Sequence, residues 1–364
     1  MVLTSYTVNG SSSSSQAIKG VYYPSWISSN FSPSSINTKL FTHVYYAFLT
    51  PNNVTFKFDI EQTQEAPLLL NFTSTLHTKN PPVKTIFSVG GAAEGPVLFS
   101  RMVADSSSRW HFILSSIEVA RKFGFDGVDL DWETPQNPED MENLSHLLDE
   151  WRVEVEKEAK ATGRAELLLS AAVYYSADLS GPPRSYPSAS ITKNLDWINV
   201  MTYDYHGAWD PTLTGANAAL YDSKSIVSTS YGVQSWIRSG VPLSKLIMGL
   251  PLYGRTWQLK DPRSYFIGAP AVDVGPGPDK TGVLTYAEIV QYNKDHKAKV
   301  VHDMETVSVY SVAGNIWIGY DDTKTVAVKI GYARAIGLRG YFFWAVGGDY
   351  KWKISKTASK LWSL

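Results

Sequence analysis

Residues 123–133 read FGFDGVDLDWE, and this stretch decides the fold. In a β-strand, successive side chains point to opposite faces, so the stretch separates into an apolar face and an acidic face. The apolar face consists of Val128, Leu130 and Trp132. The acidic face carries Asp129, Asp131 and Glu133, whose side chains repeat roughly every 6.5 Å along the strand. Gly124 ends a helical pattern just before the strand, which indicates a fold in which helices and strands alternate.

The row of three carboxyl groups has two interpretations. A solvated acidic edge strand is the simpler one, but the large apolar face opposite the acids favours a strand that is packed on that side. Crowded carboxyl groups cannot all ionise cheaply, so we expect at least one raised pKa in the row. Glu133, the last of the three, is then a candidate general acid.

Eight segments of the chain have the β-branched and aromatic composition of strands. They are 20–23, 42–48, 84–89, 125–133, 167–173, 197–203, 246–251 and 340–344. Helical patterns lie between most of them, and the clearest of these end at Gly124, Gly163 and Gly337. Alternating strands and helices imply parallel pairing and right-handed crossovers. Eight such units in 364 residues predict an α/β fold, a closed (β/α)8 TIM barrel.

One interval after the seventh strand breaks this alternation. It contains a Gly-Pro-Gly-Pro break at 275–278 and several short aromatic runs, which indicate a small α+β insertion domain beside the mouth of the barrel. A serine-rich segment at the start of the chain predicts a flexible tail. The expected boundaries are 1–17 for the tail, 18–254 with 323–364 for the barrel, and 255–322 for the insertion.

The composition excludes several classes of function. The chain has 33 Lys plus Arg against 34 Asp plus Glu, so we expect neither nucleic acid nor an anionic membrane as a partner. No stretch is long and apolar enough to span a bilayer. The absence of cysteine excludes disulfides, thiolate metal sites and a cysteine nucleophile. Aromatic residues make up 13% of the chain, which favours a cleft that stacks flat apolar faces such as those of sugar rings.

Five Asn-x-Ser/Thr sequons favour the secretory route, so we expect a secreted or vacuolar protein. They begin at Asn9, Asn30, Asn53, Asn71 and Asn143. The first twenty residues lack the apolar core of a signal peptide, so no such signal is expected within this chain. The chain has seven His, but no pair has metal-ligand spacing. We expect a monomer that uses neither a metal nor a cofactor.

In a barrel of this kind, functional residues gather where the strands end. Glu133 closes the fourth predicted strand, and Tyr203 and Asp204 lie at the end of the sixth. The eighth strand ends with the broad indole of Trp344, followed by flexible backbone. The third ends with Ser-Val-Gly-Gly at 88–91, which leaves space for a ligand beside the main chain. These strand ends form the candidate site.

At these positions the chain resembles the family 18 glycoside hydrolases, the chitinases. Residues 126–133 match the DGxDxDxE signature of that family, 88–91 are similar to its SxGG motif, and 201–204 are similar to its MxYD motif. Residues 249–255 resemble the segment that ends its seventh strand. The spacing and the sequence WIGYDD at 317–322 are most similar to the plant class V chitinases, whose fold is a (β/α)8 barrel with an α+β insertion.

The resemblance implies an endo-type chitinase, which cleaves β-1,4-linked N-acetylglucosamine in chitin or chitooligosaccharides with retention and with participation of the substrate. Glu133 would protonate the leaving oxygen, and the N-acetyl oxygen of the sugar would attack. Asp131 would orient the acetamido N–H, Asp129 would share a proton with Asp131, and Tyr203 would hydrogen-bond the acetamido oxygen. The implied substrate-binding residues are Tyr22, Trp26, Phe48, Ser88, Met201, Asp204, Trp209, Arg255 and Trp344.

Two positions depart from the pattern of the family. Thr134 stands where the family commonly has Tyr, and Ala92 stands where many chitinases have Trp. Neither change removes a proton donor or acceptor from the implied mechanism. Both affect binding on the leaving-group side, so a modified, lipid-bearing chitooligosaccharide is an alternative substrate.

Two further alternatives belong to other functional classes. A carbohydrate-binding protein or inhibitor on the same scaffold would be expected to lack the acid, and Glu133 is intact. A carboxylate-metal enzyme could hold Mg²⁺ through the oxygens of Asp129, Asp131 and Glu133. Activity that survives chelation would exclude the metal alternative.

Overall fold

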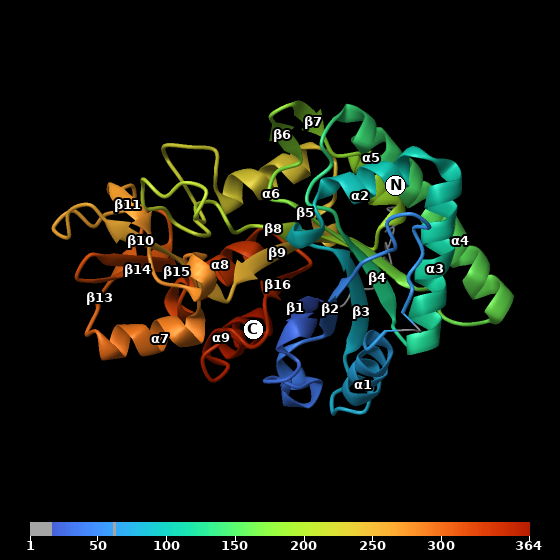
Figure 1. Ribbon diagram of the computed structural model, residues 1–364, viewed down its shortest axis with the longest axis horizontal. Coiled ribbons are helices and arrows are strands. Elements are labelled where there is room, and N and C mark those ends of the chain that lie inside the picture. The colour runs from blue at the N-terminus through green and yellow to red at the C-terminus, as the bar shows by residue number, and fades with distance from the viewer. Residues whose placement is uncertain (1–16, 61–62) are drawn as a thin grey trace, which may run out of the picture.

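The computed structural model describes residues 17–60 and 63–364, so the predicted tail lies outside the described residues except for residue 17. Eight parallel strands form a closed barrel, which confirms the predicted (β/α)8 fold (Figure 1). The barrel strands are β1 (Ile18–Pro24), β2 (His43–Leu49), β3 (Lys84–Gly90), β4 (Gly127–Asp131), β5 (Leu168–Tyr174), β8 (Trp197–Met201), β9 (Leu246–Pro251) and β16 (Gly340–Trp344). Around the barrel they follow the order β1-β16-β9-β8-β5-β4-β3-β2.

Helices surround the barrel, and their ends follow the capping signals of the sequence (Figure 1). They are α1 (Glu65–His77), α2 (Pro96–Ala104), α3 (Ser106–Phe123), α4 (Pro138–Thr162), α5 (Ser188–Asn194), α6 (Thr229–Arg238), α8 (Thr323–Ala335) and α9 (Lys353–Trp362). Gly124 and Gly163 cap α3 and α4 in the left-handed conformation, with φ of 75° and 69°. Gly337 follows α8 with φ of 84°. Glycine adopts this conformation without a steric penalty, so all three predicted helix ends are confirmed.

β4 pairs in parallel with β3 on one side and with β5 on the other. The side chains of its apolar face, Val128, Leu130 and Trp132, are buried in the main core. Gly127 must be glycine, because a Cβ there would lie 2.4 Å from the main-chain oxygen of Leu168. The strand stops at Asp131, whose oxygen accepts a hydrogen bond from Gly91 N at 2.9 Å, and the chain then turns toward α4. The prediction that the strand continues to Glu133 is therefore wrong.

The chain between β9 and α8 forms a second, antiparallel sheet, which lies at the left in Figure 1. Its elements are β10 (Tyr253–Leu259), β11 (Ala271–Val274), β12 (Val283–Thr285), α7 (Tyr286–Asp295), β13 (Lys299–Asp303), β14 (Ser308–Ala313) and β15 (Ile316–Tyr320). Trp257, Tyr310 and Trp317 pack together in its core. The predicted α+β insertion is confirmed, while its boundaries, 255–322, stay a prediction.

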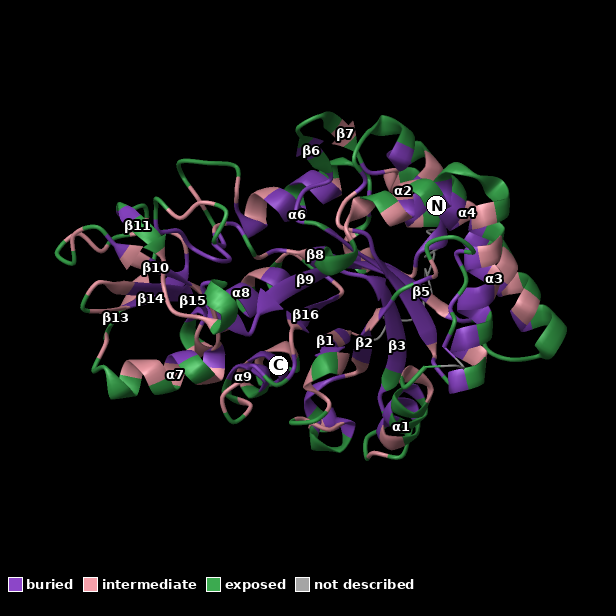
Figure 2. Ribbon diagram, in the orientation of Figure 1, coloured by how far each residue is buried: buried purple, intermediate pink, exposed green. Residues whose placement is uncertain are grey.

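Buried residues follow the barrel strands and the inward faces of the helices (Figure 2). A separate buried cluster, which includes Tyr22, Tyr45, Trp197 and Phe342, fills the inside of the barrel. A filled barrel leaves its end as the place for a ligand. A short hairpin of β6 (Asp178–Ser180) and β7 (Pro183–Ser185) follows β5. In the part of the chain that the structure describes, no helix is long and apolar enough to cross a membrane.

Candidate active site

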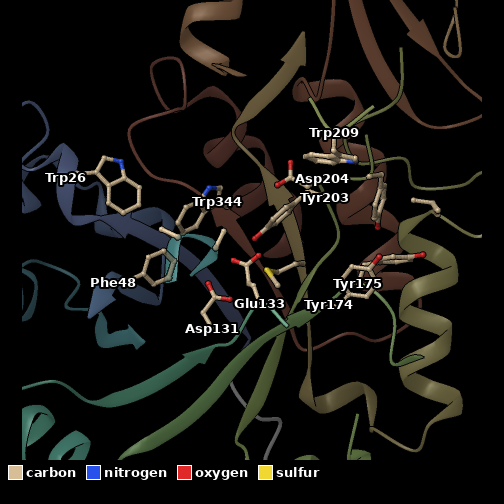
Figure 3. Close-up of a pocket in the computed structure, with 15 residues that line it drawn as sticks. Trp26, Phe48, Asp131, Glu133, Tyr174, Tyr175, Tyr203, Asp204, Trp209 and Trp344 are labelled. Carbon is tan, nitrogen blue, oxygen red and sulfur yellow. The ribbon is translucent and has the colours of Figure 1, made fainter. Parts of the chain in front are cut away.

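A cavity of about 520 Å³ opens where the barrel strands end (Figure 3). Three carboxyl groups, several aromatic rings and a few small apolar side chains line it. The lining residues are Trp26, Phe48, Ala92, Ala93, Asp131, Glu133, Tyr174, Tyr175, Met201, Tyr203, Asp204, Tyr205, Trp209, Val227 and Trp344. Acids among aromatic rings suit a ligand that presents both polar groups and flat apolar faces.

Asp129 lies at the base of the acidic row and is completely buried. Its Oδ2 accepts hydrogen bonds from Tyr22 Oη at 2.8 Å and Ser88 Oγ at 2.7 Å. Its Oδ1 accepts from Ser170 Oγ at 2.6 Å and Asn199 Nδ2 at 3.4 Å. Burial raises the pKa of Asp129, and these four donors oppose that rise because they stabilise the carboxylate. Asp129 therefore lies below the cavity floor, and its four donors offset part of the cost of burying a carboxylate.

Asp131 occupies the middle of the row, at the end of β4, and lines the cavity. Its Oδ1 is buried and has no hydrogen-bond partner among the described residues. Burial, followed by the charges of Glu133 and Asp129, raises its pKa well above the ordinary value. A buried acceptor without a partner is costly, so Oδ1 is suited to receive a hydrogen bond from a ligand.

Glu133 lies two residues beyond β4 and lines the cavity at its centre (Figure 3). Burial, and next the charge of Asp204, raises the pKa of Glu133 to about 7. A hydrogen bond with the main chain of Ala92 partly opposes this rise. The expectation of a raised pKa in the acidic row is confirmed, and Glu133 can hold a proton near neutral pH.

Tyr203 lies just beyond β8, which ends at Met201 rather than at the predicted residue 203. Both side chains line the cavity. The phenol of Tyr203 is near Tyr253 and Phe342, with ring centroids 6.3 and 6.0 Å apart. Burial, followed by the charges of the nearby acids, raises the pKa of Tyr203 well above 10. The phenol therefore stays neutral and keeps its proton for a hydrogen bond.

Asp204 is held by two residues that come from β10. Its Oδ1 accepts hydrogen bonds from Tyr253 Oη at 2.7 Å and from Arg255 Nη2 at 2.6 Å. The guanidinium of Arg255 also lies over the Trp209 ring, 4.9 Å from its centroid. The insertion thus fixes two cavity residues, Asp204 and Trp209.

A wall of aromatic rings lies on the other side of Glu133 (Figure 3). Trp344 stacks on Phe48 with ring centroids 5.5 Å apart and an interplanar angle of 19°. Trp26 lies 6.4 Å from each of these rings and is 63% exposed. Trp209, near the opposite arm of the cavity, is 60% exposed. Exposed indoles at a cavity mouth give broad surfaces for stacking.

The structure thus brings most of the predicted site residues to one cavity, but it places four of them behind the lining. These are Tyr22, Ser88, Asp129 and Arg255. Tyr22 and Ser88 bind Asp129 instead of lining the cavity, and Arg255 binds Asp204. Tyr22, Ser88 and Arg255 thus support the carboxyl groups of Asp129 and Asp204, and their roles as substrate-binding residues stay a prediction.

Several cavity residues were absent from the prediction. Tyr174 is the last residue of β5 and Tyr175 follows it directly, with their ring centroids 4.7 Å apart. They could have been found from sequence, because the end of every barrel strand reaches the same face. Tyr205 lies just after the sixth predicted strand and carries the same signal, whereas Val227 carries none, since its loop reaches the cavity only through the tertiary fold.

A filled barrel with a protonatable carboxyl and stacked aromatic rings at its C-terminal mouth defines a carbohydrate-cleaving barrel enzyme. The chain belongs to the glycosyl hydrolases family 18, whose family model matches residues 19–349. It is 50% identical over 356 residues to Nod factor hydrolase protein 1 of Medicago truncatula, covering 96% of this chain and 91% of the relative.

Two further comparisons agree with this assignment. A class V chitinase of Medicago truncatula is 48% identical over 352 residues, covering 95% of this chain and 91% of the relative. The crystal structure of a class V chitinase from Nicotiana tobaccum in complex with NAG4 has a TM-score of 0.91 and 40% identity, and the match covers 96% of this chain and 99% of that chain. The resemblance to plant class V chitinases is therefore confirmed across nearly the whole chain.

Proposed function

We propose that this protein is a chitinase that hydrolyses β-1,4-linked N-acetylglucosamine polymers or oligomers by a substrate-assisted retaining mechanism. The observation that carries the proposal is Glu133, a carboxyl group with a pKa of about 7 in a cavity walled by aromatic rings. Family membership supports the same activity. We propose cleavage within the chain, because the cavity has aromatic rings on both sides of Glu133 (Figure 3).

Glu133 is the proposed general acid. Its raised pKa keeps a useful fraction protonated at neutral pH, and the carboxyl donates this proton to the glycosidic oxygen as the bond breaks. The resulting carboxylate then accepts a proton from the water that completes hydrolysis. Electrostatic repulsion from Asp204 and the low polarity of the site both favour the proton donor form before the reaction.

The proposed nucleophile is the N-acetyl carbonyl oxygen of the substrate, which closes on its own anomeric carbon. Asp131 is a poor nucleophile in this site, because its pKa is raised well above the ordinary value and a protonated carboxyl group attacks poorly. Its buried Oδ1, which lacks a protein partner, is instead placed to accept the acetamido N–H. The neutral phenol of Tyr203 donates to the acetamido oxygen and orients it for attack.

Asp129 is proposed to share a proton with Asp131. The four donors around Asp129 favour its carboxylate form, whereas Asp131 has no such support. The proton can therefore move within the pair as positive charge develops on the substrate amide, so that Asp131 stabilises that charge.

The sugar at the cleavage point is proposed to lie on Trp344, next to Phe48 and Met201. Trp26 offers a stacking face further along one arm of the cavity, and Trp209 offers one near the other arm. Asp204 accepts hydrogen bonds from the sugar with the oxygen that Arg255 and Tyr253 leave free. Stacking below and hydrogen bonds at the edge together fix the ring relative to Glu133.

The direct test compares wild type with Glu133→Gln on chitotetraose, with product release measured by chromatography. The glutamine has nearly the same shape but cannot donate a proton, so we expect a loss of about 10²- to 10⁴-fold in kcat. Glu118→Gln, an exposed position on α3, is the matched control and should keep the wild-type rate. Equal release from wild type and Glu133→Gln would refute the assigned acid. No release from wild type would favour a binding protein.

A second candidate substrate is a modified, lipid-bearing chitooligosaccharide. The relative that is 50% identical bears the name of a Nod factor hydrolase, and Ala92 and Thr134 lie on the proposed leaving-group side. The two candidates are separated by kcat/KM on plain chitotetraose and on the same oligomer with an N-acyl chain. A preference of more than tenfold for the acylated oligomer would support this second candidate.

We also propose a secreted or vacuolar location and a monomeric state. Three of the sequon asparagines, Asn30, Asn53 and Asn71, are exposed, as glycan attachment requires. The proposed site draws all its residues from one chain, so it needs no second copy. Glycosidase-sensitive mobility of the plant-expressed protein and its mass by light scattering test these two proposals.

A further inference from the structure

Glu133 lies outside the barrel sheet, so the pairing of β4 does not hold it. Its position is set by its hydrogen bond with the main chain of Ala92 and by the segment that follows it. β4 ends at Asp131, and the chain then crosses to the start of α4 at Pro138. In the described ranges, the main chain of 133–136 makes no hydrogen bond to other main-chain groups. Side chains must therefore hold this segment, because a loose segment would let the acid move relative to the bond that it protonates.

The far end of the segment is fixed by the start of α4. Asn137 caps the helix, with its Oδ1 accepting from Asp140 N at 2.8 Å. The buried carboxylate of Asp140 in turn accepts from Gln136 N at 2.8 Å. These bonds do not reach residues 134–135, which are the residues next to the acid.

Arg184, from the hairpin strand β7, binds both of those residues. Its Nε donates to the main-chain oxygen of Pro135 at 2.5 Å, and its Nη2 donates to Thr134 Oγ1 at 3.4 Å. Its Nη1 donates to the oxygen of Pro182 at 2.8 Å, within the same hairpin. The donors of a guanidinium form a rigid planar fork, so these contacts fix the orientation of the segment as well as its distance.

The hairpin gives Arg184 a fixed base. Tyr186, two residues further on, is buried, and its ring centroid is 5.1 Å from that of Trp236. Its main-chain N–H donates to the oxygen of Ala177 at 3.0 Å. The N–H of Ala177 donates to Ser235 Oγ on α6 at 2.8 Å. The base of the hairpin is thus tied to the barrel and its outer helix.

We propose that Arg184 is a positioning residue, which fixes the place of Glu133 by holding the two residues that follow it, Thr134 and Pro135. The proposal rests on the proposed role of Glu133 as the general acid. Arg184 is not among the residues that line the cavity, so it acts through the segment and not on the substrate. Its loss leaves the Pro135 oxygen without this donor and lets the acid shift, which slows proton transfer more than it weakens sugar binding.

The test compares two leaving groups. A sugar needs a proton in order to leave, whereas 2,4-dinitrophenolate leaves without one, so only cleavage at a sugar depends on the placement of Glu133. Arg184→Met keeps an apolar stem and removes the donors. We expect kcat/KM for chitotetraose to fall by about 10- to 100-fold, mostly in kcat, and kcat/KM for 2,4-dinitrophenyl chitobioside to change less than about threefold. Arg184→Lys restores one donor and should recover part of the loss.

Arg121→Met is the matched control. Arg121 also joins two segments, through Nε to Glu158 and Nη2 to the oxygen of Ala165, but it lies on α3 and does not line the cavity. It should keep both rates. An equal loss on both substrates in Arg184→Met would overturn the positioning role, because lost stability or a distorted cleft affects both reactions.

Glu133→Gln, measured in the same assays, distinguishes the two ways of failing. A wild-type rate for Glu133→Gln on chitotetraose means that the proposed function fails. An inactive Glu133→Gln combined with a fully active Arg184→Met means that only the positioning role fails.

Discussion

Replacement of Glu133 by Gln is expected to stabilise the protein at alkaline pH while it abolishes activity. Burial and the charge of Asp204 raise the folded-state pKa from the ordinary 4.5 to about 7. The folded protein therefore binds a proton more tightly than the unfolded chain, and stability falls as pH rises from 4.5 to 7. A shift of about 2.5 units at 1.36 kcal/mol each corresponds to about 3 kcal/mol lost by wild type above pH 7. Glutamine does not ionise and avoids this loss.

The assay is the free energy of unfolding from urea titrations of both proteins at pH 4 and pH 8.5. From pH 4 to pH 8.5, the free energy of unfolding of Glu133→Gln should rise by about 3 kcal/mol relative to that of wild type. Comparison across pH removes any constant effect of the amide on packing. Removal of the Glu133 charge also lowers the pKa of Asp131, which adds to the effect with the same sign. A constant difference for Glu133→Gln would refute the buried, raised-pKa acid.

Three further predictions concern activity. The kcat/KM of wild type should fall about tenfold per pH unit above about pH 7, and a rate that still climbs above about pH 9 contradicts the assigned acid. Asp204→Asn should move this fall to lower pH, because it removes a charge that raises the pKa of Glu133. Trp344→Ala should lower kcat/KM by about 5- to 150-fold through lost stacking, whereas Trp110→Ala, an exposed indole on α3 that does not line the cavity, should not. EDTA at fixed pH should leave the rate unchanged, since no three His, Cys, Asp or Glu side chains among the described residues are placed to hold a metal ion. A loss of activity that Mg²⁺ restores would support the carboxylate-metal alternative.

Local sequence was sufficient to predict the strands and helices that form the barrel. Alternation in 123–133 predicted which side chains of β4 would be buried in the core and which would form the acidic row. Glycines at the ends of α3 and α4 predicted where those helices stop, because the left-handed conformation favours glycine locally. The predicted ends of β4 and β8 were wrong by two residues, since a strand stops where its neighbours stop pairing.

Contacts between distant segments carried no such local signal. Arg184 reaches Pro135 across 49 residues, and Arg255 reaches Asp204 across 51. Each pair depends on how two segments that are far apart in the sequence pack against one another.

The sequence by itself determined that this chain forms a (β/α)8 barrel of family 18 with Glu133 at the end of an acidic row, because strand alternation and motif spacing are properties of neighbouring residues. Only the tertiary structure decided the proton affinity of Glu133, the support of Asp204 by β10, and the placement of Val227 in the cavity. Burial and charge proximity set these properties, and both arise from segments that meet only when the barrel closes.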